Sequence, residues 1–275
     1  MATPTPPAER RRRLVRRRRR RYAVTFDVET TGPKGRGIIF SIGLSVVECP
    51  LEGRFTLPAD VVPCERIRLT LRLLSPLERA AYGPDASDAD VWADVWQRRG
   101  WHESTFTKCW GLAPNLEMLS RLNAEAQYYD DQAFAMAFDA TIARLERKYR
   151  VTPPPPAEGS DMFYVFDKMH FDVVWLDHIL SCLGAQSLGY YRRDSRSPAS
   201  WDLESYVCGL LGLTPWLMDR EVDLQPVLNE LTALANTVAR HDHDPANDAY
   251  HLAVQFLMAE HVCTRTRIEP PPGFE

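Results

Sequence analysis

Two acidic residues, Asp27 and Glu29, stand between the apolar stretch 22–26 and the turn-forming segment 30–32. If residues 22–29 form a strand, side chains two apart point to the same side, so both carboxylates lie on one face. Carboxylates held this close repel each other and lose hydration, which is unfavourable unless a cation lies between them. Oxygen ligands of this kind suit Mg²⁺ or Mn²⁺. The pair predicts either a divalent-metal site or two solvated charges at a strand end.

A third carboxylate is expected from residues 164–176, which read as a strand followed by a helix. Asp172 falls at the predicted helix start, where its side chain can face the metal site or simply cap the helix. Asp167 is the competing candidate for the same role. Lys168, beside it, either meets a substrate phosphate or pairs with a nearby carboxylate.

The segment 243–250 places a histidine five residues before an aspartate. Pro245 fits the first turn of a helix, so Asp248 lies within that helix and His243 lies in the loop before it. His243 is therefore a candidate general base and Asp248 a fourth carboxylate ligand. His241 has a similar loop position and is the alternative base.

Together these segments match the needs of phosphodiester hydrolysis by two divalent ions. That chemistry requires several carboxylates from separate elements and a base that takes the proton of the attacking water. The chain supplies four carboxylates and one preferred base: Asp27, Glu29, Asp172, Asp248 and His243.

The elements that must position these residues follow from hydrophobic patterns and turn signals along the chain. Three strands are predicted to form a meander, a helical insertion interrupts the fold, and a proline-rich loop leads back to a fourth strand. In chain order we predict strands at 22–27, 38–48 and 61–73, the insertion at about 75–150, the loop at 152–160, a strand at 161–166, and helices at 171–183, 203–213, 224–240 and 245–261.

The insertion is rich in large aromatic residues, including Trp92 and Trp96 four residues apart. Helical spacing of this kind is typical of a packed interior. The alternative is a lid whose aromatic side chains stack on a bound base.

The charge is distributed unevenly. Residues 10–21 contain ten arginines, whereas residues 22–275 hold 23 basic and 36 acidic residues, a net charge of −13. We call residues 1–21 the arginine arm, and three interpretations of it stay open. It attracts nucleic-acid phosphate, it is a nuclear-import signal, or it is a tail with little consequence. On the first interpretation Arg16, Arg17 and Arg18 contact the substrate backbone.

The cellular setting follows from cysteines and hydropathy. Six cysteines lack a Cys-x-x-Cys spacing and are expected to be buried thiols in a reducing compartment. No apolar run is long enough to span a membrane, and the arm lacks the apolar region of a signal peptide. We expect an intracellular protein of the nucleus or cytoplasm. A mitochondrial location is less favoured, because the arm has no amphipathic pattern.

All three segments resemble, in the same order, the three motifs of a known enzyme family, and the first motif is the most specific of them. Phe26-Asp27-Val28-Glu29-Thr30-Thr31-Gly32, followed by Ile42-Gly43, and the later His243-x-x-x-x-Asp248 resemble motifs of the DEDDh (DnaQ-like) 3′–5′ exonucleases. The resemblance covers residues 22 to about 261. It implies an α/β, RNase H-like mixed sheet flanked by helices, two Mg²⁺ or Mn²⁺ ions, and release of nucleoside monophosphates from single-stranded 3′ ends of RNA or DNA.

The same resemblance implies roles for individual residues. Asp27, Glu29, Asp172 and Asp248 are the implied metal ligands, His243 is the general base, and the backbone of Thr30 contacts the terminal nucleotide. The second motif departs from the family, because Asp167 and Lys168 stand where relatives commonly carry His-Asn. Relatives include both monomers and dimers, so a homodimer stays open.

We therefore expect an arm at 1–21, one exonuclease domain at 22–263 and a flexible tail at 264–275. The alternative function is a nucleic-acid-binding module that keeps the exonuclease fold without catalysis. A third hypothesis is a recruitment factor whose arginine arm is the active part.

Overall fold

The computed structural model describes residues 21–50, 55–149, 162–182, 199–212 and 224–265. Arg16, Arg17 and Arg18, the loop at 152–160 and most of the tail lie outside the described residues.

The centre of the fold is a five-stranded mixed sheet with the strand order β3-β2-β1-β4-β5. The first three strands form an antiparallel meander, and the last two run parallel to β1. The strands are β1 (Arg21–Thr30), β2 (Ile39–Cys49), β3 (Pro63–Thr70), β4 (Met162–Phe166) and β5 (Ala199–Asp202). The predicted meander and mixed α/β sheet are confirmed; β5 was not predicted, because its four residues show no apolar run.

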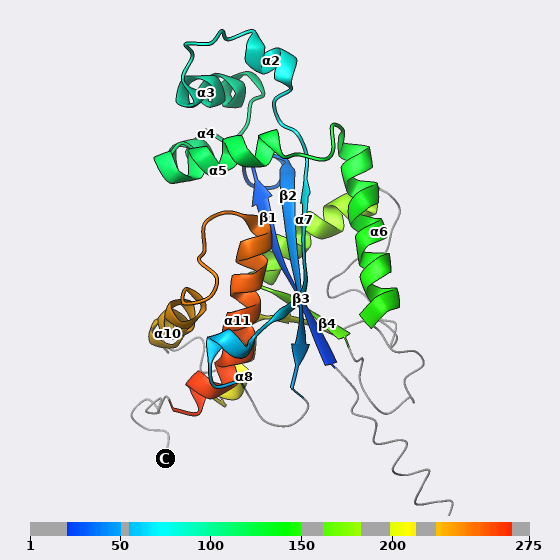
Figure 1. Ribbon diagram of the computed structural model, residues 1–275, viewed down its shortest axis with the longest axis vertical. Coiled ribbons are helices and arrows are strands. Elements are labelled where there is room, and N and C mark those ends of the chain that lie inside the picture. The colour runs from blue at the N-terminus through cyan, green and yellow to red at the C-terminus, as the bar shows by residue number, and fades with distance from the viewer. Residues whose placement is uncertain (1–20, 51–54, 150–161, 183–198, 213–223, 266–275) are drawn as a thin grey trace, which may run out of the picture.

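Helices flank both faces of the sheet and extend beyond one end of it (Figure 1). The helix predicted at 224–240 ends earlier, at Ala235. The helical segments are η1 (Pro58–Asp60), α2 (Pro76–Ala80), α3 (Asp88–Arg98), α4 (Glu103–Thr105), the π-helical η2 (Phe106–Trp110), α5 (Ala113–Ala124), α6 (Asp131–Tyr149), α7 (Met169–Cys182), α8 (Leu203–Leu210), α10 (Gln225–Ala235) and α11 (Pro245–Cys263).

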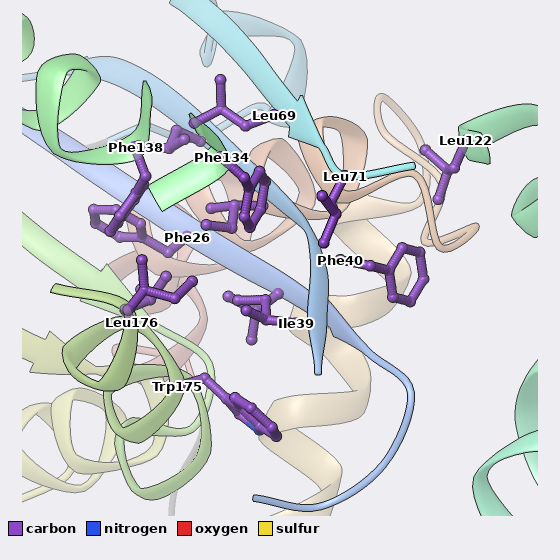
Figure 2. Close-up of a cluster of buried hydrophobic side chains, with 14 of the residues drawn as sticks. Phe26, Ile39, Phe40, Leu69, Leu71, Leu122, Phe134, Phe138, Trp175 and Leu176 are labelled. Atoms are coloured by element: carbon purple, nitrogen blue, oxygen red, sulfur yellow. The ribbon is translucent and has the colours of Figure 1, made fainter. Parts of the chain in front are cut away.

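The side chains of β1 divide the core into two layers. Val24, Phe26 and Val28 belong to the layer covered by α6 and α7, where Phe26 lies near Phe134, Phe138 and Leu176 (Figure 2). Ala23 belongs to the opposite layer, which contains α8, α10 and α11. Because side chains alternate along a strand, Asp27 and Glu29 share the α11 side with Ala23.

The segment predicted as an insertion has two structural parts. α2 to α5 lie beyond the end of the sheet, whereas α6 runs along it (Figure 1). Trp92 and Trp96 are buried, and their indole N–H groups donate to Ser120 Oγ at 2.9 Å and to the His102 carbonyl at 3.1 Å. For these two tryptophans the packing interpretation is confirmed.

The cysteines are only partly as predicted. None of the six, all of which lie in described segments, forms a disulfide. Cys49, Cys208 and Cys263 are buried, but the prediction was wrong for Cys64 and Cys182, which are exposed. Cys64 lies on β3, a strand at the edge of the sheet where one side chain in two faces outward. None of the described helices is both long and apolar enough to cross a membrane.

The start of α11 lies almost against the backbone of β2. A Cβ atom at Gly43 would lie 1.8 Å from the Pro245 carbonyl oxygen and 2.5 Å from the Ala246 nitrogen. Gly43 pairs with Asp27 across the sheet. One turn further along α11, the Thr25 hydroxyl donates to the Ala249 carbonyl. Only glycine at position 43 permits this contact, which brings α11 next to the acidic end of β1.

We predict that Gly43→Ala destabilises the protein by about 1–3 kcal/mol, because the methyl group must push α11 away from β2. Gly209→Ala is the matched control, since a Cβ at Gly209 in α8 meets nothing within 4 Å. That substitution is expected to be neutral or to stabilise by about 0.5–1 kcal/mol. The urea concentrations at the unfolding midpoint measure the stability of both variants. Equal midpoints for Gly43→Ala and the wild type would contradict the close contact between α11 and β2.

Candidate functional site

Four carboxylates from three elements lie together at the end of β1. Asp27 and Glu29 come from β1, Asp172 from the first turn of α7, and Asp248 from the first turn of α11. Glu29, Asp172 and Asp248 are 8%, 5% and 3% exposed, and Asp27 is partly buried. Carboxylates are seldom so buried without a compensating partner.

The electrostatics of the cluster favour protons or a cation. Burial raises the pKa of Asp27 well above its usual range, and the charges of Glu29, Asp248 and Asp172 raise it further. Burial also raises the pKa of Glu29, followed by the charges of Asp248 and Asp172. Asp27 Oδ2 is buried and has no hydrogen-bond partner among the described residues. An acceptor oxygen in that position is what a bound cation would satisfy.

Asp172 is held by the backbone at the beginning of α7. The Lys168 amide donates to Asp172 Oδ2 at 3.2 Å, while burial raises the pKa of Asp172 to about 7. Asp167 is exposed at the end of β4, yet its charge also acts on Asp27. The buried position of Asp172 makes it the better candidate ligand. The exposed Lys168 contacts Asp172 through its amide, and a phosphate contact by its side chain stays a prediction.

Asp248 is oriented by the loop that precedes α11. Its two oxygens accept from the amides of Asp242 at 3.0 Å and His243 at 2.9 Å. Burial raises its pKa to about 7 in spite of these bonds. His241 Nε2 lies 3.4 Å from Asp248 Oδ2. The loop therefore fixes the carboxylate while presenting two histidines beside it.

His243 contacts the cluster from a strained backbone position. Its φ of 61° is in the left-handed region, which non-glycine residues seldom adopt and which is often found at functional sites. Its Nδ1 lies 3.3 Å from Glu29 Oε1, and ligand atoms of Glu29, His243 and Asp248 lie within 4.8 Å of one another. His243 thus contacts Glu29, whereas the alternative base His241 contacts Asp248.

Trp110 brings the insertion into this site, a role that the sequence did not indicate. The indole is 1% exposed, and its N–H donates to the Thr30 carbonyl at 3.0 Å. Its ring centroid lies 5.4 Å from that of His243. The Thr30 carbonyl therefore already accepts a hydrogen bond from Trp110. That the Thr30 backbone also contacts a substrate stays a prediction.

Two arginines hold the histidine loop through Asp244, which was also missed. Arg68 of β3 and Arg121 of α5 each place a guanidinium nitrogen 2.8 Å from Asp244 Oδ2. The other oxygen of Asp244 accepts from the Ala246 amide at 3.1 Å and so caps α11. An aspartate just before Pro245 is a cap signal in the sequence, but its arginine partners are far away along the chain.

A divalent metal ion fits these residues. The cluster offers oxygen ligands, holds unfavourable like charges together and contains one buried oxygen without a hydrogen bond. Asp27, Glu29, Asp172 and Asp248 would hold the ion, and an oxygen-dominated set suits Mg²⁺ or Mn²⁺ better than softer metals.

Comparison with known proteins finds similarity at low levels. No protein-family profile and no curated protein sequence matches the chain. Among solved structures, the nuclease domain of 3′hExo, described as a DEDDh family member bound to rAMP, is 9% identical. It aligns over 91% of this chain and 97% of its own, with a TM-score of 0.46.

Two exonuclease I structures align less completely. The apo form is 13% identical and aligns over 89% of this chain, with a TM-score of 0.41. The metal-free form of the E. coli ExoI–ssDNA complex is 14% identical and also aligns over 89% of this chain, with a TM-score of 0.41. The chain spans only 44% and 40% of those two proteins. At these scores the function proposed below rests on the geometry of the site alone.

We predict that the metal-free protein loses stability as the pH rises from 5 to 8. The folded pKa values of Asp172 and Asp248, about 7, exceed the ordinary value of 3.8, so the folded state binds more protons in this range. The lowered pKa values of His241 and His251 act in the opposite direction below about 6.5. Asp172→Asn removes one carboxyl group with a raised pKa. The melting temperature of this variant, measured in EDTA, should therefore fall less steeply between pH 5 and pH 8.

Mn²⁺ is expected to raise the melting temperature more at pH 8 than at pH 5, because the metal competes with protons for the same oxygens. Asp172→Asn should reduce this shift, and the surface control Asp139→Asn on α6 should keep it. An equal shift at both pH values would contradict metal binding at the cluster.

Proposed function

We propose that the chain is a metal-dependent 3′–5′ exonuclease that hydrolyses single-stranded RNA or DNA from its 3′ end. The observation that carries the proposal is the convergence of four acidic side chains, at the end of β1 and in the first turns of α7 and α11, with His243 beside them. The predicted roles of these five residues, as four ligands and one base, fit this arrangement.

Bound Mg²⁺ or Mn²⁺ would polarise the phosphate and make the attacking water more acidic. The chain's own contribution is to receive the proton. His243 is a partly exposed imidazole in contact with Glu29, so it accepts the proton of the water, and the Glu29 carboxylate stabilises the resulting imidazolium. The Asp248–amide bonds keep the base and the carboxylates in one arrangement.

A cavity of about 380 Å³ next to His243 offers a place for the 3′ end. It lies between α5 and the loop 240–243 and is lined in part by Met118, Arg121 and Arg240. Its volume is within the range of small-ligand sites. Backbone contacts from Thr30, a phosphate contact from Lys168 and tethering by Arg16, Arg17 and Arg18 complete the proposed substrate interactions.

The setting proposed for this activity is a reducing intracellular compartment, the nucleus or the cytoplasm. Six free thiols support it, because such thiols persist where disulfides are reduced.

We expect a ladder of products that shorten from the 3′ end when 5′-labelled single-stranded RNA or DNA is incubated with Mg²⁺ or Mn²⁺. EDTA should abolish the ladder, Asp27→Asn should remove nearly all activity, and Asp139→Asn on the surface of α6 should retain it. Products from the interior of the strand would rule out exonuclease action. Binding without cleavage under every metal condition would favour the non-catalytic module.

We predict that His243→Asn lowers kcat by about 10²–10⁴-fold, because the general base is lost. Asparagine tolerates the left-handed conformation, so the loop should keep its structure. His241→Asn is the matched test of the competing assignment and is expected to have a much smaller effect. The reverse order of the two effects would assign the base to His241.

A further inference from the structure

A second cavity lies at the junction of the sheet with the insertion, apart from the carboxylates. Its volume is about 360 Å³, its floor contains the buried Leu71 and Leu73, and its rim contains Arg72, Arg99, Trp101 and Tyr129. We refer to it as the arginine–aromatic cavity. Two cations and two aromatic rings around an apolar floor offer stacking surfaces and positive charge in one place.

Each arginine of the rim lies over one of the aromatic rings. The Arg72 guanidinium is 4.8 Å from the centroid of Tyr129, and the Arg99 guanidinium is 5.4 Å from that of Trp101. Tyr129 is 69% exposed, so the ring face opposite Arg72 can receive a ligand. Exposed aromatic rings beside arginines are the parts that single-strand-binding proteins use to stack bases.

The charge of the cavity favours a phosphate. Among the residues that the structure describes, no carboxylate forms an ion pair with Arg72, whose guanidinium reaches the Ala124 and Ala126 carbonyls at 3.3 and 3.4 Å. Arg99 pairs with Glu78 at 3.2 Å, but this surface pair is weak and open to exchange. Asp131 adds one negative charge to the lining. The two arginines and one aspartate of the lining carry a net charge of +1, which Glu78 neutralises only while it stays paired with Arg99.

The cavity adjoins the strand pair that carries the candidate catalytic carboxylates. Ile38 belongs to its lining and exchanges two hydrogen bonds of 2.9 Å with Thr31, through the Thr31 amide and the Thr31 hydroxyl. Thr31 follows Glu29 by two residues. The lining of the cavity is therefore connected by hydrogen bonds to the segment that directly follows β1 and its acidic end.

We infer that the arginine–aromatic cavity is a second binding site for single-stranded nucleic acid, upstream of the 3′ end. A base stacks on Tyr129, and Arg72 and Arg99 contact the neighbouring phosphates. This inference rests on the proposed exonuclease function for the identity of the ligand, although binding can be measured without hydrolysis.

The test is fluorescence anisotropy of a labelled single-stranded oligonucleotide with the full chain in EDTA. Tyr129→Ala should weaken binding about fivefold or more, since one base–aromatic stack is lost, whereas Tyr129→Phe should bind as the wild type. Arg99→Gln should reduce the slope of log affinity against log salt by about 0.7, the value for one phosphate contact on a single strand. Met136→Ala is the control, because Met136 is an exposed apolar side chain on α6 outside the cavity lining.

Hydrolysis separates this site from the active site. KM for a long strand should rise in Tyr129→Ala, while kcat and the cleavage of a trinucleotide stay unchanged. If the wild type binds but never cleaves and Tyr129→Ala still weakens binding, the exonuclease proposal fails and the cavity stands. If cleavage is normal and Tyr129→Ala and Arg99→Gln bind as the wild type, the cavity proposal is overturned. Equal competition by a free nucleoside monophosphate would also overturn it, by assigning the cavity to a mononucleotide.

Discussion

The near-contact between the first turn of α11 and the backbone of β2 brings α11 next to the acidic end of β1. Gly43 allows the Pro245 carbonyl to lie where any other side chain would begin. Asp27 pairs with Gly43, and Asp248 lies one turn into α11, so the same contact brings these carboxylates together. The loop before α11 is drawn to the sheet with it, which places His243 beside Glu29. The missing side chain at Gly43 thus allows α11 and the loop before it to bring Asp248 and His243 next to Asp27 and Glu29.

The carboxylate cluster is costly for the protein without a cation, and the surrounding structure holds it in place. Burial and mutual repulsion both act against the ionised groups. Three sets of contacts hold the site together in spite of this repulsion. They are the amides that donate to Asp248, the two arginines that pair with Asp244, and the indole of Trp110 that donates to Thr30. Trp110 and Arg121 belong to the segment 76–124. That segment therefore supports the site directly and is more than an appendage to the sheet.

Local pattern was sufficient to predict most of the elements but few of the contacts between them. The apolar run before Asp27 and Pro245 before Asp248 are local signals, and β1 and α11 were predicted close to their observed bounds. β5 was missed because a strand of four residues carries too little periodicity. The bonds of Trp110 to Thr30 and of Arg121 to Asp244 were missed because they join residues 80 and 123 positions apart. No local pattern specifies such partners.

The wide sequence separation of the acidic groups has a consequence for the newly made protein. Asp27 and Glu29 emerge from the ribosome early, whereas Asp248 belongs to the last helix described and is the final carboxylate of the cluster to be synthesised. The Thr25–Ala249 bond that draws α11 to the sheet joins residues 224 positions apart. This bond cannot form until nearly the whole domain has been synthesised. A growing chain whose β1 has already been made therefore holds Asp27 and Glu29 next to each other before Asp248 and the loop that carries His243 can join them.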